Sequence, residues 1–232
     1  MNHSVEGMPG GMKENVRRRP EPALSLPHPV RYPPGMSTLV VVKKAGVICL
    51  GADTALNSNG LQRRAPYAVN QTKIVATADG FIGVSGVIKT AGALRAILAA
   101  EPRIKLHSVD QIHAAFNKFR KLLVDEHGLN LGTSESDEYS SIHSNFLVAN
   151  PHGIFGVGCD GAVAEYSQFW ARGSGADLAL GSMFSTYGTA AAESIARTAL
   201  EAAAEFDTAT AAPFEFKIIP FREPKPRQKA SR

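Results

Sequence analysis

An abrupt change of composition at residue 38 limits what this chain can fold into. Residues 1–35 contain seven prolines and little periodic hydrophobicity, so they bury too little apolar surface to offset the entropy lost on ordering. From residue 38, two β-rich runs, TLVVVKK and VICLGAD, flank the turn-forming pair Ala45-Gly46. This pattern predicts a β-hairpin over residues 38–53. We therefore expect a disordered leader over residues 1–36, one folded domain over 37–220 and a basic, disordered tail over 221–232.

The rest of the domain consists of blocks of strand pattern and blocks of helix pattern. KIVAT and FIGVSG, on either side of residues 78–80, predict a second hairpin. A helical period follows over 90–100 and 108–127, where Ser108 and Gln111 have the spacing of a capping box and Gly128 is a helix stop. Strands are predicted over 144–150, 154–159, 163–170 and 213–220, a loop over 132–141, and an alanine-rich helix over 189–206. Such blocks, without βαβ alternation, indicate an α+β fold in which helices cover antiparallel sheets.

Composition bounds the size and the partners of this domain. With 232 residues, of which 44% are hydrophobic, the chain can build one sizeable core and is too short for two ordinary domains. Its formal net charge of +4 arises from basic residues in the two Pro-rich termini. A nucleic-acid site would instead interleave basic and aromatic residues on a folded face, so we expect no nucleic-acid partner. The terminal basic residues include Arg17, Arg18, Arg19, Arg31, Arg222, Lys225, Arg227, Lys229 and Arg232.

The cysteines, the histidines and the hydropathy pattern indicate a cytoplasmic protein without a metal site. Cys49 and Cys159 are the only cysteines, and neither has a partner at the spacing of a zinc site or a disulfide framework. No window approaches the ~18 apolar residues of a membrane span, and no apolar segment follows the N-terminal arginines as it would in a signal peptide. Five histidines show no ligand or triad spacing, so we interpret them as ordinary surface or core residues. They are His107, His113, His127, His143 and His152.

The first predicted hairpin carries the feature that suggests a function. The segment STLVVVKKAGVICLGAD, residues 37–53, resembles the opening hairpin of proteasome β and HslV-type subunits, which are N-terminal nucleophile (Ntn) hydrolases. In that family the nucleophilic Thr or Ser begins the first strand and an Asp ends the second. Ser37 and Asp53 are 53 − 37 = 16 positions apart, the spacing of the family, and the K-K-A-G turn also fits. Placing Thr38 at the nucleophile position breaks both agreements, so the resemblance assigns this role to Ser37.

Three further segments match the family in order. Lys73 begins the third strand where the family has its active-site lysine, and Ser85-Gly86 falls where a Ser-Gly turn supplies an oxyanion-hole N–H. The segment RGSG at 172–175 resembles the G-S-G element of the family, and a last pair near residue 210 has the spacing of its supporting Asp and Ser. The resemblance covers residues 37 to about 220 and implies a four-layer αββα sandwich of two antiparallel sheets flanked by helices. The catalytic residues that it implies are Ser37, Asp53, Lys73, Gly86, Ser174, Asp207 and Thr210.

These residues could hydrolyse a peptide bond without a cofactor or a metal. A serine hydroxyl is a weak nucleophile, but an N-terminal serine has its own α-amine as a base, and the pKa of such an amine is ordinarily ~8. A positive Lys73 beside that amine disfavours a second charge and keeps the amine neutral, while Asp53 holds the lysine in place. The Gly86 N–H would stabilise the tetrahedral oxyanion. Without the resemblance, Lys73 would be interpreted as a solvated strand-edge charge and Asp207 as a polar helix end.

Two features depart from the family pattern, and two other functions stay open. Met36 separates Gly35 from Ser37, so residues 1–36 are expected to be either a propeptide or an extension upstream of the true start at Met36. The nucleophile is Ser rather than the commoner Thr. The F-D-T-A-T segment and the Pro-Phe strand resemble the betaproteobacterial proteasome homologue (BPH) or its relative Anbu more than HslV. The alternatives are a catalytically inactive proteasome-fold structural subunit and an Ntn amidase acting on a small molecule.

The resemblance also implies the partners. An exposed N-terminal nucleophile has to be sequestered, and the family achieves this with stacked rings of identical subunits that admit unfolded polypeptides or peptides. The predicted helices over 90–100 and 108–127 carry apolar residues on more than one side, so we expect them to form the contacts between subunits. The sequence leaves open whether an ATPase unfoldase works with the rings.

Overall fold

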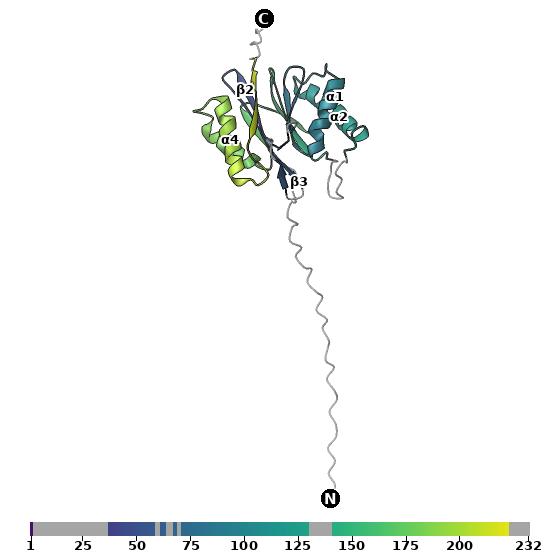
Figure 1. Ribbon diagram of the computed structural model, residues 1–232, viewed down its shortest axis with the longest axis vertical. Coiled ribbons are helices and arrows are strands. Elements are labelled where there is room, and N and C mark those ends of the chain that lie inside the picture. The colour runs from purple at the N-terminus through teal and green to yellow at the C-terminus, as the bar shows by residue number, and fades with distance from the viewer. Residues whose placement is uncertain (2–36, 59–60, 64–66, 69–70, 130–140, 223–232) are drawn as a thin grey trace. The chain divides into compact units, whose positions relative to one another are not determined.

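The computed structural model describes residues 1, 37–58, 61–63, 67–68, 71–129 and 141–222 (Figure 1). The leader predicted over 1–36 lies outside these ranges except for Met1, and the loop predicted over 132–141 lies outside them except for Ser141. Of the tail predicted over 221–232, only Phe221 and Arg222 are described. Both donate backbone hydrogen bonds to the folded domain, at 2.9 and 2.8 Å. The backbone of these two residues is therefore tied to the described domain.

Two antiparallel sheets form the centre of the domain. The first has the strand order β10-β1-β2-β11 and the second the order β5-β6-β7-β8-β9. The strands of the first sheet are β1 (Thr38–Lys44), β2 (Val47–Asp53), β10 (Phe169–Gly173) and β11 (Phe214–Pro220). Those of the second are β5 (Ile74–Ala76), β6 (Phe81–Gly86), β7 (Ser144–Asn150), β8 (Gly153–Val157) and β9 (Val163–Tyr166). A separate pair, β3 (Leu56–Ser58) and β4 (Leu61–Arg63), is not predicted by the sequence pattern.

Two pairs of helices cover the outer faces of these sheets. Helices α1 (Ile88–Ala100) and α2 (Val109–Asp125) pack on the five-stranded sheet, and α3 (Ala176–Thr186) and α4 (Ala192–Phe206) pack on the four-stranded sheet. Figure 1 shows α4 on one side of the strands and α1 and α2 on the other. No helix in the described ranges has both the length and the apolarity that a membrane span requires. The order of layers is helix, sheet, sheet, helix, which confirms the predicted αββα sandwich.

The burial of β1 explains why its sequence is apolar almost throughout. Val40 and Val42 belong to the core beneath α3 and α4, whereas Leu39 and Val41 belong to the core between the two sheets. All four side chains are fully buried. Successive residues of a strand point to opposite faces, so a strand that is covered on both faces needs a continuous apolar run. Strand β1 therefore lies in the middle of the sandwich, with Ser37 immediately before it.

Local turn and cap signals agree with the structure. Ala45 and Gly46 have φ angles of 50° and 74°, the pair of positive values that a two-residue hairpin turn requires. At the start of α2, the Ser108 side chain accepts the backbone N–H of Gln111, and after its end Gly128 has a φ of 60°. The predicted hairpin, helix start and helix stop are confirmed.

One predicted strand is two strands in different sheets. The stretch VAEYSQFW, predicted as continuous over 163–170, contains β9, which pairs with β8, and the start of β10, which pairs with β1. The chain crosses between the sheets at Ser167 and Gln168. Each half contains residues favoured in strands, Val163 and Tyr166 in the first and Phe169 and Trp170 in the second, so the residue pattern alone does not show the crossing. The alanine-rich helix also begins later than predicted, at Ala192, and is preceded by α3.

The apolar residues of α1 do not form the free surface that the sequence pattern suggested. They are buried against the five-stranded sheet of the same chain, so the expectation that they make contacts between subunits is corrected. These residues are Ala93, Leu94, Ile97 and Leu98. Large exposed apolar side chains lie instead on the other helical layer, where Phe184 of α3 is 80% exposed and Phe206, at the end of α4, is 75% exposed.

Candidate active site

A buried ion pair lies at the end of β2. Asp53 closes this strand without solvent exposure, and Lys73, the residue before β5, is 5% exposed. Lys73 Nζ donates to both carboxylate oxygens of Asp53 at 2.8 Å and to the carbonyl oxygen of Ala55 at 2.5 Å. The same carboxylate accepts the backbone N–H groups of Thr38 at 2.9 Å and of Ala55 at 3.0 Å. Lys73 is therefore not a solvated strand-edge charge, because its ammonium group is held by buried acceptors.

Burial acts against the charge on both partners of this pair. Desolvation raises the pKa of Asp53 and lowers the pKa of Lys73, because it disfavours the ionised form of each group. The attraction between the two groups opposes both shifts, and the N–H donors of Thr38 and Ala55 also oppose the rise in the pKa of Asp53. Each charge is thus maintained by the other. Removing one partner would leave the remaining charge buried and unpaired.

A second polar network joins the end of α4 to the start of β1. Asp207 is the C-cap residue of α4, and its Oδ2 accepts the hydroxyl groups of Ser174 and Thr210, both at 2.6 Å. Because the Thr210 hydroxyl donates to Asp207, it accepts from the Thr38 hydroxyl, which lies at 2.6 Å. Thr38 Oγ1 in turn accepts the Gly175 N–H at 3.1 Å. The hydrogen bonds in this network therefore all have one defined direction.

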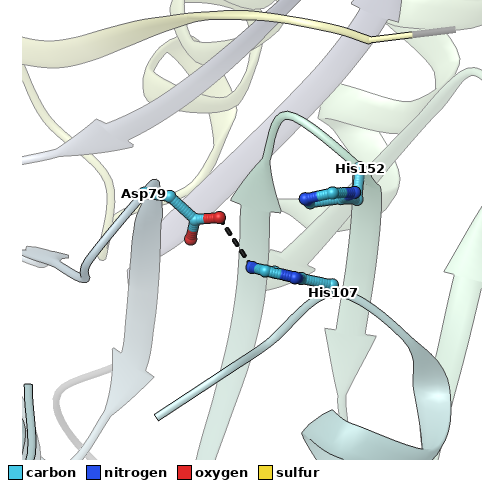
Figure 2. A group of neighbouring side chains, drawn as sticks. All are labelled: Asp79, His107 and His152. Atoms are coloured by element: carbon cyan, nitrogen blue, oxygen red, sulfur yellow. Dashed lines mark ion pairs between the residues drawn. The ribbon is translucent and has the colours of Figure 1, made fainter. Parts of the chain in front are cut away.

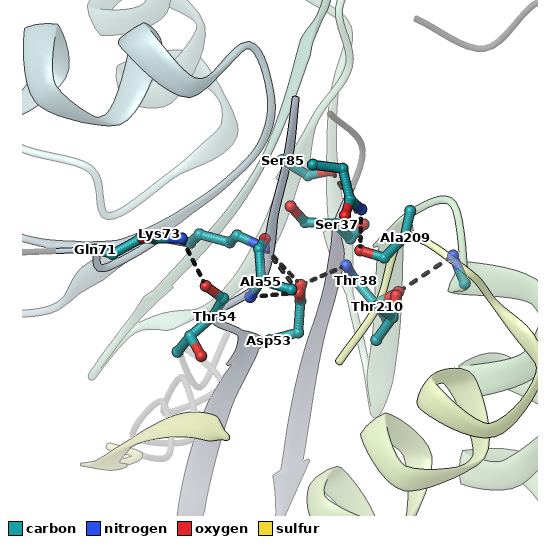
Figure 3. A network of polar contacts seen from close by, with 12 residues as sticks. Ser37, Thr38, Asp53, Thr54, Ala55, Gln71, Lys73, Ser85, Ala209 and Thr210 are labelled. Carbon is teal, nitrogen blue, oxygen red and sulfur yellow. Dashed lines mark hydrogen bonds and ion pairs between the residues drawn. The ribbon is translucent and has the colours of Figure 1, made fainter. Parts of the chain in front are cut away.

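Thr38 connects the two networks. Figure 3 shows it between Asp53 on one side and Thr210 on the other. Its backbone N–H donates to Asp53, its hydroxyl donates to Thr210, and the residue is fully buried. Sequence reasoning considered Thr38 only as an alternative nucleophile and missed this structural role. The available signal was a hydroxyl residue at the start of an otherwise apolar, doubly covered strand, because a buried polar group of that kind needs partners.

Ser37 is fixed through its main chain. Its carbonyl oxygen accepts the Ser174 N–H at 3.2 Å and the Ser85 hydroxyl at 3.3 Å, so it is tied to the turn after β10 and to β6 of the other sheet. Gly173 makes this approach possible: its φ is 107°, and a Cβ atom there would lie 1.5 Å from the Ser37 oxygen. A side chain at Gly173 would push Ser37 out of place.

Ser37, Lys73 and Gly86 line one cavity of about 290 Å³. Gly86 ends β6 with a φ of 122°, and a Cβ atom there would come within 2.2 Å of the His143 carbonyl oxygen. The turn that follows β6 consequently depends on glycine. The cavity is bounded on its other sides by residues of β3, β4 and α1, among them Arg63 and Arg95.

The structure brings the seven predicted site residues into one region. Three of them line the cavity, one lies behind Lys73 in the ion pair, and three form the network that ends on Thr38. The residues that line the cavity are Ser37, Lys73 and Gly86, the residue behind Lys73 is Asp53, and the network residues are Ser174, Asp207 and Thr210. Asp207 is therefore more than a polar helix end, because it accepts two side-chain hydroxyls.

The four-layer sandwich has the fold of proteasome-like Ntn hydrolases. BPH of Thiobacillus denitrificans aligns with a TM-score of 0.76 and 31% identity, over 81% of this chain and 100% of that chain. The same protein in complex with epoxomicin aligns with a TM-score of 0.74 and 31% identity, over 80% and 99%. Eukaryotic HslV from Trypanosoma brucei shares the fold at 17% identity, with a TM-score of 0.56 over 79% and 99%.

A search of protein-family models and a search of curated proteins found no match. The 31% sequence identity to the Thiobacillus protein, over the whole length of that protein, nevertheless shows the family of this chain. This chain belongs to the BPH family of proteasome homologues.

Proposed function

We propose that this chain is a peptidase subunit whose nucleophile is Ser37, exposed as the N-terminal residue when residues 1–36 are removed. The observation that carries the proposal is that Ser37 lines one cavity with Lys73 and Gly86, while Asp53 holds Lys73 from behind. The peptidase domain would comprise residues 37–220, between a leader and a basic tail. Membership of the BPH family supports a proteasome-type subunit, and the hydrolytic activity is our inference from the site.

The reaction would proceed through an ester on Ser37. Its freed α-amine takes the proton of the hydroxyl, directly or through one water, as Oγ attacks the carbonyl carbon of a peptide bond. The Gly86 N–H stabilises the negative oxygen of the tetrahedral adduct. The adduct then collapses with cleavage of the C–N bond, and the ammonium returns the proton to the leaving amine. A water molecule, deprotonated by the same amine, hydrolyses the ester and restores the hydroxyl.

The surrounding residues would act by charge and by position. A positive Lys73, held by Asp53, lowers the pKa of the nearby α-amine and so keeps it unprotonated and able to act as a base. Ser174, whose hydroxyl is fixed by Asp207, positions Ser37 through its backbone N–H. Thr38 supports Ser37 rather than replacing it as nucleophile, because its hydroxyl is buried and bound on both sides.

The charge of the cavity suggests a preference among peptides. Arg63 and Arg95 are exposed and line the cavity beside Ser37, and its lining residues in the described ranges include no acidic side chain. The charge of Lys73 is balanced by Asp53, so the two guanidinium groups supply the unbalanced positive charge. Guanidinium groups bind carboxylates with short, charge-assisted hydrogen bonds. We propose that peptides with an acidic side chain next to the cleaved bond are preferred.

Assembly is the second part of the proposal. Phe184 and Phe206 expose large apolar surfaces on the α3–α4 layer, and such surfaces are typical of protein contacts. We propose that identical subunits meet through this layer in stacked rings that enclose Ser37 in the cytoplasm, with unfolded polypeptides or peptides as substrates. An ATPase unfoldase is a further candidate partner of these rings.

Three measurements on one preparation of the full chain test this function. They are the N-terminal residue by mass spectrometry, the native mass, and the turnover of fluorogenic peptides. Ser37 at the N-terminus, a large homo-oligomer and turnover that epoxomicin inhibits would support the proposal. A large oligomer without turnover and without epoxomicin binding would indicate the inactive structural subunit. A monomer that hydrolyses only small amides would indicate the Ntn amidase.

A further inference from the structure

Side chains of the kinds that bind metals lie close together at one edge of the five-stranded sheet (Figure 2). Asp79 is in the turn between β5 and β6, His107 immediately precedes the N-cap residue of α2, and His152 is in the turn between β7 and β8. Each offers one ligand atom, and all three atoms lie within 4.8 Å of one another. The turn that holds Asp79 is at the opposite end of the β5–β6 hairpin from Lys73 and Gly86. This cluster is therefore separate from the candidate active site.

The contacts within this cluster show that its polar atoms face one another. His107 Nε2 lies 2.6 Å from Asp79 Oδ2. The rings of His107 and His152 are stacked, with centroids 4.0 Å apart and planes inclined by 24°. Figure 2 shows the Asp79 carboxylate facing the edges of these stacked rings. The polar atoms of Asp79 and His107 are therefore directed at a common position, which a metal ion could occupy.

The three loops are held together by a buried amide. Asn150 is 1% exposed; its Nδ2 donates to the Leu106 carbonyl oxygen at 2.6 Å, and its Oδ1 accepts the His152 N–H at 2.8 Å. The third loop packs directly on the same residue, since a Cβ atom on Gly80 would lie 2.7 Å from the Asn150 Cβ. Asn150 thus fixes the backbones that carry Asp79, His107 and His152, so the cluster does not depend on chance contacts of long surface side chains.

We propose that Asp79, His107 and His152 bind a first-row divalent transition metal of the zinc class. Imidazole nitrogen and carboxylate oxygen suit such an ion, whereas calcium and magnesium favour oxygen ligands alone. In a tetrahedral site the ligand atoms lie about 3.3 Å apart, so the 2.6 Å contact between His107 and Asp79 has to open slightly to admit the ion. Asp79 and His152 are exposed and can turn toward the ion without disturbing the core. Water fills the remaining coordination positions, and the bound ion ties the three loops together.

Zinc titration of the full, tag-free chain by calorimetry tests this proposal. We expect one ion per chain, and binding weaker by about tenfold or more in His152→Ala and in Asp79→Asn. His113→Ala is the matched control, because His113 is an exposed histidine of α2 outside the cluster. The zinc affinity of this variant should equal that of the wild type. Cobalt binding should give visible d–d bands in the wild type that are lost in His152→Ala. Thermal unfolding of the metal-free variants checks that each one folds.

Several results would overturn the site. Equal zinc affinity in the wild type and in folded His152→Ala would place the ion elsewhere. A loss of zinc affinity in His113→Ala or in Cys159→Ala would do the same. Weak binding in His152→Ala combined with full affinity in Asp79→Asn would show a two-histidine contact and exclude the three-ligand site. None of these readouts uses peptide hydrolysis, so they are independent of the proposed peptidase function.

Discussion

The Asp53–Lys73 and Asp79–His107 contacts have similar lengths, 2.8 and 2.6 Å, but different surroundings. The side chains of Lys73 and Asp53 are 6% and 0% exposed, and their remaining polar contacts are made by the backbone. Those of His107 and Asp79 are 30% and 36% exposed. The buried pair is a fixed electrostatic support, whereas the Asp79–His107 pair at the edge of the sheet, here called the edge pair, is open to solvent and can admit another ligand. Burial, more than the chemical type of the residues, decides which role a pair can have.

The largest expected effect tests whether peptide hydrolysis takes place at Ser37, beside the buried Asp53–Lys73 pair. Ser37→Ala should lower peptide turnover by at least about 10³-fold, because it removes the attacking oxygen and almost no packing. His113→Ala, an exposed change on α2, should keep wild-type turnover. Steady-state hydrolysis of a fluorogenic peptide, at equal oligomer concentration, measures both. Wild-type turnover in Ser37→Ala would exclude Ser37 as the nucleophile.

The second effect separates the two ion pairs by stability. Lys73→Met should lower the free energy of unfolding by about 3–5 kcal/mol, because it leaves the Asp53 charge buried and unpaired. The double variant Asp53→Asn with Lys73→Met should recover most of this loss while remaining inactive. At the edge pair, Asp79→Asn should change stability by no more than about 1 kcal/mol, as is usual for surface pairs.

Urea unfolding of the three variants gives these differences directly. Two outcomes would contradict the comparison. A stable Lys73→Met would mean that Asp53 is readily neutralised in the folded chain, and a large loss in Asp79→Asn would mean that the edge pair is as structural as the buried one.

A smaller effect concerns the arginines of the cavity. Replacing both Arg63 and Arg95 by Ala should lower kcat/KM for peptides with Glu beside the cleaved bond by about 10- to 100-fold, the loss expected for hydrogen bonds to a charged group. The same variant should cleave peptides with Leu at that position as well as the wild type does. The ratio of the two kcat/KM values is the measurement. An equal loss for both peptides would show that the arginines position the site and do not select the substrate.

Much of the sandwich could be predicted because its signals are local. The turn at Ala45 and Gly46 sets the first hairpin, and the hydroxyl of Ser108 starts α2 within three residues. The assignment of strands to sheets is not local. Strands β9 and β10 are separated by two residues, yet they pair with β8 and β1, and no property of the two intervening residues shows that the chain changes sheets.

The same distinction applies to the two polar regions. Ser37 and Asp53 could be proposed together because, in the family that this hairpin resembles, the nucleophile and the Asp have this spacing along the chain. Thr38 was missed because its hydroxyl partner, Thr210, is 172 positions away. The edge cluster was missed for a similar reason: its members are 107 − 79 = 28 and 152 − 107 = 45 positions apart, and only the folded sheet brings their loops together.

A buried thiol extends the comparison to titration. Cys49 of β2 is fully buried, and burial raises the pKa of its thiol from 9.0 to about 12; the Glu193 carboxylate adds to the rise and Arg197 partly offsets it. With a raised pKa, the folded chain keeps a proton that the unfolded chain loses. The resulting stabilisation is complete below pH 9.0 and is lost as the pH rises toward about 12.

The free energy of unfolding should therefore fall between about pH 8 and pH 10, and ionisation of Cys49 in the unfolded chain should account for about 1.4 kcal/mol of that fall. Cys49→Ala should make the fall smaller by this amount, even though the lost volume lowers its stability at every pH. Val42→Ala is the matched control, because it also removes buried volume beside Cys49 but no ionisable group, so its curve should run parallel to that of the wild type. Urea unfolding at each pH provides the values. Parallel curves for Cys49→Ala and the wild type would mean that this buried thiol ionises as readily in the folded chain as in the unfolded one, which is incompatible with the closed layer between β2 and α4.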